Sequence, residues 1–226
     1  SPELIFQSDG DITQFSEELR LNGSTMNMKW VAGFYYLNID TEYLQGLAAS
    51  PTGGYLAGEE QNTLADITTD SYSVFGQIDY DLDDDLVLVA GLRLVQENKS
   101  LDGQLVQNAN LDDRVIEVDD TATPLVDVAL ENDKFMWSAK LQLDYKPNED
   151  TLLYAGVNRG VKAGNFNAPL GGAFSTYDPE VLLAYEAGAK LTLMDGKAQV
   201  NSSVFYYDYE DYQSFSWVNN AGVVFN

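Results

Sequence analysis

Runs of roughly ten residues with an apolar side chain at every second position repeat along this chain. Four short turns alternate with three long polar segments between the runs. Successive side chains in a β-strand point to opposite faces of the sheet, so each run predicts a strand with one apolar and one polar face. Tight turns at one end and long loops at the other are typical of an antiparallel β-barrel that spans a membrane.

The alternation predicts eight strands and the start of a ninth near Ser214. The eight predicted ranges are 13–21, 27–39, 69–80, 86–98, 134–145, 151–158, 181–193 and 198–209. Residues that tolerate turn dihedrals form the short connections, at 22–26, 81–85, 146–150 and 194–197. We expect long loops over 40–68, 99–133 and 159–180.

The run 134–145 shows the two faces most clearly. Its odd positions from Phe135 to Tyr145 are aromatic or aliphatic, whereas Lys140, Gln142 and Asp144 occupy even positions. An unpaired lysine in a dry core would be costly, so the polar face should meet water. A wet lumen and a lipid-facing exterior satisfy both faces at once.

Aromatic residues gather near both ends of the predicted strands, as they do at the two interfaces of a bilayer. Those beside the short turns are Trp30, Tyr80 and Tyr145. Those toward the long segments are Tyr72, Phe135, Trp137, Tyr206, Tyr207 and Tyr209. The strands also match the roughly 9–11 residues that cross a bilayer at a tilt.

Composition excludes several classes of protein. The mean hydropathy is -0.23 and no run of 18 apolar residues occurs, which argues against a helical membrane protein. With 36 acidic and 12 basic residues the formal net charge is -24, so we expect no nucleic-acid partner. The chain has no cysteine and no histidine. Disulfides, Ser-His-Asp catalysis and histidine-ligated zinc are therefore excluded, and we expect neither an enzyme nor a cofactor.

A soluble antiparallel sheet with one buried face would show the same alternation. A soluble or surface-attached β-sandwich that binds carbohydrate or calcium therefore remains an alternative. The segment 81–85 begins like a calcium loop, but Leu86 and Leu92 replace the required glycine and glutamate, so we interpret it as a turn. For the carboxylates between Asp112 and Asp120, a solvated acidic loop is favoured over a weak divalent-ion site.

Several segments resemble, in order, motifs of the TonB-dependent receptors of the Gram-negative outer membrane. They are 14–21 with 30–36, 73–80 with 90–93, 153–167, 177–180, 185–190 and 195–196. The chain departs from the family where Val161 replaces a frequent aromatic and where Ala163 and Asn165 replace commoner small residues. The succession nevertheless covers nearly the whole chain.

The resemblance implies an all-β, antiparallel transmembrane β-barrel segment, about 8–9 strands of a plugged barrel of roughly 22 strands. Residues 1–226 would form part of a single outer-membrane β-barrel domain, with the plug domain absent. A closed single-chain barrel has an even strand count, so we expect a piece of a larger barrel. Its two unpaired strand edges should make the isolated piece aggregate.

The resemblance also implies a function, namely TonB-coupled uptake of a scarce nutrient across the outer membrane of a Gram-negative bacterium. The nutrient would be siderophore-iron, cobalamin or an oligosaccharide. The expected partners are outer-membrane lipid, the small-molecule nutrient, and TonB through a plug region that this chain lacks.

In such receptors the long loops and the upper lumen meet the substrate. The candidate substrate-binding residues are therefore Arg159, Lys162, Asn165, Asn167, Tyr209, Tyr212 and Trp217. A structural role is the more common alternative: Arg159 and Lys162 would then pair with lumen carboxylates, and Gly160 and Gly164 would serve the loop backbone.

Overall fold

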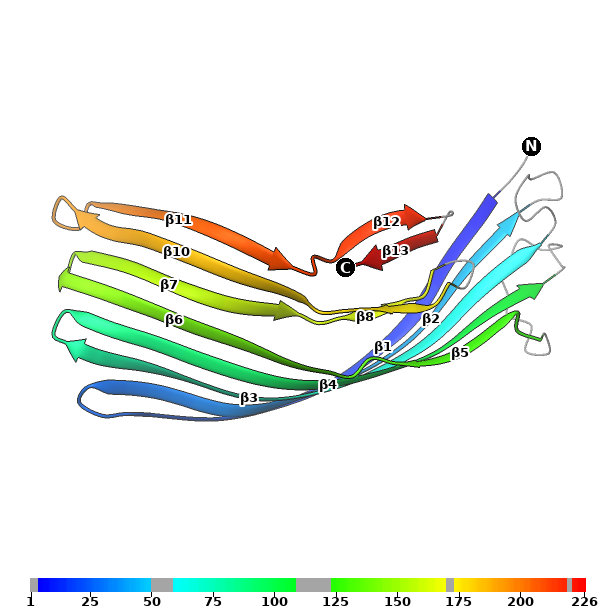
Figure 1. Ribbon diagram of the computed structural model, residues 1–226, viewed down its shortest axis with the longest axis horizontal. Helices are drawn as coiled ribbons and strands as arrows, with labels where there is room; N and C mark the ends of the chain where they lie inside the picture. The colour runs from blue at the N-terminus through cyan, green and yellow to red at the C-terminus, as the bar shows by residue number, and fades with distance from the viewer. Residues whose placement is uncertain (1–3, 50–58, 109–122, 170–172, 219–220) are drawn as a thin grey trace.

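The computed structural model describes residues 4–49, 59–108, 123–169, 173–218 and 221–226, and every secondary-structure element in them is a β-strand (Figure 1). No helix within these ranges is long and apolar enough to cross a membrane. The alternation therefore predicts the fold class correctly.

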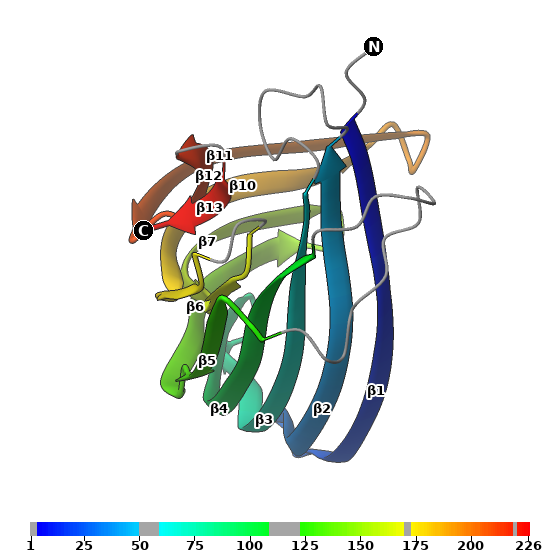
Figure 2. The ribbon, with the colours of Figure 1, turned by 90° about the vertical axis from the view of Figure 1, so that its right-hand side faces the viewer.

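Eight strands form one continuous antiparallel sheet in the order β1-β2-β3-β4-β6-β7-β10-β11. Their bounds are β1 Leu4–Ser24, β2 Met28–Ala49, β3 Glu60–Asp83, β4 Leu86–Asn108, β6 Lys134–Asn148, β7 Thr151–Lys162, β10 Glu180–Leu193 and β11 Ala198–Glu210. A further strand, β5 (Val126–Glu131), pairs with the last part of β4. The order follows the chain, as in an up-and-down barrel, and the sheet is strongly curved (Figure 2).

Two short hairpins complete the described part. One joins β8 (Asn165–Asn167) to β9 (Ser175–Tyr177), and the other joins β12 (Ser214–Val218) to β13 (Ala221–Phe225). A strand does begin at Ser214, but it pairs with β13 rather than continuing the large sheet as the predicted ninth strand.

The four short connections are confirmed as tight turns, and all of them lie at one end of the sheet, which we call the turn end (Figure 1). Side-chain oxygens of Asp83 and Asn148 accept hydrogen bonds from the backbone N–H groups of Asp84 and Asp150. In the last turn Gly196 has a φ of 83°, a left-handed conformation that glycine adopts without strain. We call the opposite end, where the two hairpins lie, the hairpin end.

Strands extend far beyond their predicted ranges at the hairpin end. The prediction of long loops over 40–68, 99–133 and 159–180 is therefore wrong where these segments form strands, and their residues 50–58, 109–122 and 170–172 lie outside the described part of the chain. β2 continues to Ala49, β3 begins at Glu60 and β4 continues to Asn108, and β1 begins at Leu4 instead of residue 13.

The register places each strand residue on one of two faces, because directly opposite residues share a face. We call the face against which β8 packs the inner face. There Ala65 and Leu101, each 1% exposed, contact Phe166 of β8. A Cβ atom on Gly103 of the same face would lie 2.6 Å from the ring of Phe174, so glycine is needed for this close approach.

Near the turn end the outer face is apolar and exposed. On β6, the outer residues Leu141 and Leu143 are 52% and 42% exposed, whereas Gln142 and Asp144 on the inner face are half-buried. An outer face with so many exposed large apolar side chains is unfavourable in water. It matches the hydrocarbon-facing band of a membrane barrel.

Near the hairpin end the pattern is inverted. Asp40, Glu42 and Asp66 lie on the outer face, while Tyr43 and Ile67 lie on the inner face and pack against the small core. Polar-out and apolar-in is the pattern of a sheet whose outer face meets water. This inversion explains the missed strand extensions, since acidic residues are depleted in strands and resemble loops in a sequence.

The outer apolar band is bordered by aromatic residues at both edges. Trp30, Tyr80 and Tyr145 lie on the outer face near the turns, as predicted. On the other edge, the outer face carries the predicted Tyr72, Phe135, Trp137 and Tyr206, together with Phe15, Tyr36 and Tyr185. The prediction is wrong for Tyr207 and Tyr209, because their register partners Ala184 and Leu182 are inner-face residues.

Candidate functional site

The candidate site is the inner face at the hairpin end, where both hairpins lie beside the sheet (Figures 1 and 2). The segment between β7 and β10 is fixed to the wall there by polar side chains. Lys99 is 8% exposed, and its Nζ atom lies 2.9 Å from Oε1 of Glu97 and donates a 2.7 Å hydrogen bond to the carbonyl of Gly164. Asn132 donates to the carbonyls of Asn165 and Tyr177, each at 3.2 Å.

A second set of amide side chains joins the two hairpins to each other. Nδ2 of Asn167 donates to the carbonyl of Val224 at 3.0 Å, and Oδ1 of Asn167 accepts from the N–H of Val224 at 2.8 Å. Gln213 donates to the carbonyls of Ala163 and Asp178, each at 3.0 Å. The hairpins therefore form one hydrogen-bonded unit.

Replacing Asn167 with alanine is expected to release the β12–β13 hairpin. Both backbone groups of Val224 would lose their partner, which costs about 1–3 kcal/mol for a buried group. Hydrogen exchange in the full-length protein should become faster over 221–226 in the Asn167→Ala variant. An Asn201→Ala variant, altered on the exposed inner face of β11, serves as the control. Unchanged exchange at Val224 would contradict this role of Asn167.

Tyr43 fixes the same segment from the sheet. Its hydroxyl donates a 3.2 Å hydrogen bond to the carbonyl of Ala168, and burial raises the pKa of Tyr43 to about 12. A folded-state pKa above the unfolded value of about 10 means that this stabilisation is complete below pH 10 and is lost between about pH 10 and 12.

At pH 7 we therefore expect the Tyr43→Phe variant to be about 1 kcal/mol less stable than the wild type, because it lacks one hydrogen bond. The difference should shrink above pH 10 and reverse in sign as the pH approaches 12, because ionisation then costs the wild type more than the one hydrogen bond contributes. Chemical unfolding of both proteins across this range measures it, and the comparison cancels the contributions of the other tyrosines. A difference that persists undiminished at pH 12 would contradict the assignment.

A strip of aromatic side chains runs along the inner face of β11 and beyond it. The aromatic strip consists of Phe205, Tyr207, Tyr209 and Tyr212, which are 64%, 45%, 44% and 60% exposed. The rings of Phe205 and Tyr207 are stacked at 4.8 Å, and Tyr212 meets Tyr209 edge-on at 5.5 Å. Exposed ring faces of this kind bind flat, apolar parts of ligands.

Basic residues also concentrate on the inner face. Those placed there by the register are Arg20, Lys29, Arg93, Lys99, Lys134, Lys140, Lys162 and Lys190. A groove of about 580 Å³ on this face is lined by Arg20, Arg93 and Lys140, with Glu18 as its acidic residue. The groove therefore presents mainly positive charge, although the whole chain is strongly acidic.

Two of the predicted site residues lie in β7, on different faces. Arg159 is an outer-face residue opposite Ala139 and Leu183, and its guanidinium carbon lies 3.9 Å above the ring of Trp137. It also donates a hydrogen bond to the Trp137 carbonyl. Lys162 is exposed and lies opposite Glu180 on the inner face.

The other five predicted residues belong to the hairpin end. Asn165 and Asn167 are in β8, where the side chain of Asn167 is 7% exposed and bonded to Val224. Tyr209 and Tyr212 belong to the aromatic strip. Trp217 lies in β12, and its side chain is outside the described part of the structure.

The structure also shows inner-face residues that the sequence analysis missed. Phe205 and Tyr207 could have been found from the alternation. Val204 and Tyr206 lie on the apolar outer face, so the odd positions between and after them must lie on the inner face. The contacts of Lys99 and Gln213 with the segment between β7 and β10 have no local signal, since the accepting carbonyls of Gly164 and Ala163 are distant in sequence.

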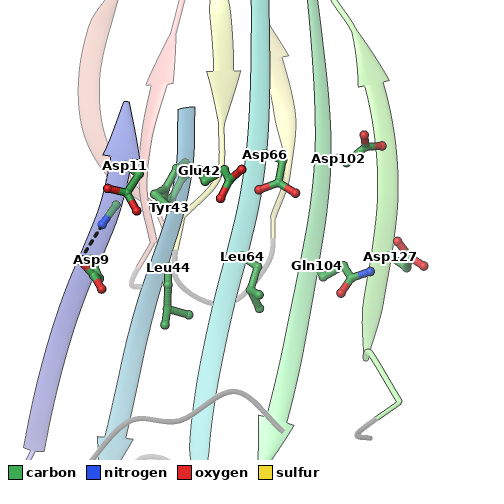
Figure 3. Close-up of a pocket in the computed structure, with 11 residues that line it drawn as sticks. Asp9, Asp11, Glu42, Tyr43, Leu44, Leu64, Asp66, Asp102, Gln104 and Asp127 are labelled. Atoms are coloured by element: carbon green, nitrogen blue, oxygen red, sulfur yellow. Dashed lines mark hydrogen bonds between the residues drawn. The ribbon is translucent and has the colours of Figure 1, made fainter. Parts of the chain in front are cut away.

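A row of carboxylates crosses the outer face of the sheet near the hairpin end (Figure 3). Asp11, Glu42, Asp66 and Asp102 are direct register partners on β1 to β4 and line a pocket of about 330 Å³. In the described ranges, no group of three or more such residues is placed to hold a metal ion. The acidic segment 112–120 lies outside the described residues.

The chain matches the sequence profile of the family described as TonB dependent receptor-like, beta-barrel, over residues 4–226. Its fold is similar to that of the ferric yersiniabactin uptake receptor of Yersinia pestis, with a TM-score of 0.76 and 18% identity over 93% of this chain and 30% of that one. It is also similar to the siderophore receptor PiuA of Acinetobacter baumannii, with a TM-score of 0.62 and 16% identity over 88% and 32% of the two chains.

A third solved structure, the alcaligin outer-membrane receptor of Bordetella pertussis, has a TM-score of 0.57 and 13% identity. The match covers 98% of this chain and 34% of that one. The chain thus spans about a third of the length of these solved receptors. At such identities the likeness establishes the fold, and the profile match over nearly all residues establishes the family. The chain belongs to the TonB-dependent receptor β-barrel family.

Proposed function

We propose that this chain forms part of the wall of an outer-membrane receptor that imports a scarce nutrient in a Gram-negative bacterium. Energy would come from TonB, which would act through a plug region outside this chain. The observation that carries the proposal is the aromatic strip, which points inward beside two hairpins fixed to the wall. Tyr207, Tyr209 and Tyr212 of this strip are the proposed ligand contacts.

The proposed cargo is a ferric siderophore. Arg20, Arg93 and Lys140 line the inner groove, and such a surface favours an anionic complex over a neutral oligosaccharide or cobalamin. Two of the solved relatives are named for ferric yersiniabactin and for siderophore binding. Both lines of support point to the same class of nutrient.

The remaining predicted residues are proposed to act on the site indirectly. The backbone carbonyl of Asn165 accepts a hydrogen bond from Asn132, and the side chain of Asn167 joins β8 to β13. Lys162 lies at the end of β7 opposite Glu180, and Trp217 lies in β12. Arg159 is proposed to stay at the membrane interface, because its guanidinium is stacked on Trp137 on the outer face.

Binding to the full-length receptor tests the proposal. The probes are a ferric catecholate siderophore, a ferric hydroxamate siderophore, cyanocobalamin and a maltooligosaccharide. We expect one of the ferric siderophores to bind, and we expect Tyr207→Ala and Tyr209→Ala each to weaken it about tenfold through loss of ring contacts. Tyr206→Ala, altered on the outer face of the same strand, should bind as the wild type does.

Two results would overturn the proposal. Binding of cyanocobalamin or the oligosaccharide in place of both siderophores would reject the cargo. Equal affinities of the Tyr206, Tyr207 and Tyr209 variants would reject the aromatic strip as the binding surface.

A further inference from the structure

The outer apolar band is not uniformly bulky. Three small residues lie on the outer face: Ala32 on β2, Gly76 on β3 and Ala90 on β4. In the register Ala32 lies opposite Gly76, and Ala90 lies opposite Ile78. Around them is a groove of about 520 Å³ whose outer-face walls are Met28, Trp30, Ile78 and Leu92. The lipid-facing side of the wall therefore has a depression about as long as half a membrane strand.

The position of the groove limits what can occupy it. It begins at Met28, the first residue of β2, and reaches Leu92 on β4, so it lies in the half of the apolar band that adjoins the turn end. Its outer-face walls carry no charged side chain. Water gains no hydrogen bonds on such a surface, whereas hydrocarbon gains contact with it.

A cluster of negative charge lies at the groove's turn end. The N–H of Asp81 donates a 2.9 Å hydrogen bond to the carbonyl of Asn27, next to Met28, which holds the β3–β4 turn beside the groove. Asp83, Asp84 and Asp85 in this turn are exposed, and none of the salt bridges in the described part of the chain involves them. Lys146 lines the same surface pocket as Asp84 and Asp85, so the turn keeps a net negative charge. Asp81 itself lies on the inner face, opposite Val87. Such a turn attracts a headgroup ammonium and repels a headgroup with net negative charge.

We propose that this groove binds one acyl chain of a phospholipid with an ammonium headgroup. The acyl chain lies over Gly76 and Ala90, and the ammonium lies beside the carboxylates of Asp83, Asp84 and Asp85. The site belongs to the leaflet on the turn side of the barrel. This inference rests on the barrel fold and is independent of the cargo proposed above.

The groove can be filled without disturbing the sheet. A Cβ atom on Gly76 would meet only the carbonyl oxygen of Val31, at 3.5 Å, which is an ordinary contact. A leucine at this position therefore extends into the groove. Ala155→Leu is the matched control, because Ala155 is an exposed outer-face residue on β7, outside the groove, opposite Leu143 and Ala187.

Native mass spectrometry of the full-length receptor provides the test. The probes are phosphatidylethanolamine and phosphatidylglycerol with identical acyl chains, each titrated into delipidated protein. We expect the wild type and the Ala155→Leu variant to retain one tightly held phosphatidylethanolamine. The Gly76→Leu variant should bind that lipid at least about tenfold more weakly, since several buried methylene groups lose their contact.

The headgroup part of the proposal has its own variant. Neutralising the turn with Asp83→Asn, Asp84→Asn and Asp85→Asn together should remove the preference for phosphatidylethanolamine while leaving one lipid bound. Equal binding of the two lipids to the wild type would overturn the ammonium assignment.

Equal lipid retention by the wild type and the Gly76→Leu variant would overturn the groove itself. If Gly76→Leu fails to fold, as judged by its mobility on unheated gels, Ala90→Leu fills the same groove from β4 and gives the same test.

Discussion

Replacing Leu141 with arginine is expected to destabilise the full-length receptor in a bilayer by roughly 2–4 kcal/mol. Leu141 is 52% exposed on the outer face of β6, between the aromatic borders formed by Tyr145 and Trp137 on the same strand. An arginine on the lipid face near the bilayer midplane costs roughly 2–4 kcal/mol in a membrane barrel. Folding into lipid vesicles from urea measures the loss directly.

The control for this change is the next residue. Gln142 lies on the inner face and donates a 2.6 Å hydrogen bond to Asp144. An arginine introduced by Gln142→Arg meets a carboxylate and water instead of hydrocarbon, so folding should be close to wild type. Comparable damage from Leu141→Arg and Gln142→Arg would show that the two faces do not differ in environment.

The second large effect is expected at Lys99. The Lys99 and Glu97 side chains are only 10% and 14% exposed, and they form an ion pair of 2.9 Å. Lys99→Met leaves the carboxylate of Glu97 buried without its cation, which typically costs 3–5 kcal/mol. It also removes the hydrogen bond to the Gly164 carbonyl, so we expect a loss of at least about 3 kcal/mol in unfolding free energy.

A double variant separates the two causes. Lys99→Met combined with Glu97→Met removes both charges and should recover much of the loss, because no unpaired charge remains. Arg20→Met provides the contrast, since the Arg20 and Glu18 side chains are 59% and 35% exposed and such pairs contribute less than about 1 kcal/mol. A double variant as unstable as Lys99→Met alone would argue against the buried charge as the cause.

The apolar band could be predicted from the sequence because one environment governs every strand there. Lipid outside and water inside impose the same alternation on Trp137 and Leu141 as on Tyr185 and Leu193, so faces and short turns follow from local pattern. The strands around the site were harder to predict. Between the apolar band and the hairpin end the outer face meets water, so Asp66 and Asp102 occupy outer positions that hold apolar residues within the band.

Arg159 shows how the strand boundary decided a site assignment. The odd positions Leu153, Ala155 and Val157 are outer-face residues, and the same alternation continues to Arg159 because β7 extends to Lys162. The predicted strand ends at residue 158, which places Arg159 in a loop and so among the candidate substrate-binding residues. The amide contacts of Asn167 with Val224 join positions far apart in sequence, and nothing local to either one predicts them.

The central claim is that odd residues of β6 face lipid and even residues face a water-filled interior. These 226 residues contain no cysteine. Spin labels are placed one at a time through single cysteines at 139 to 145 of the full-length receptor, after replacement of any cysteine elsewhere in it. The account predicts that accessibility to oxygen peaks at 139, 141, 143 and 145, and that accessibility to a polar nickel complex peaks at 140, 142 and 144. The opposite phase, or no period of two, would contradict it.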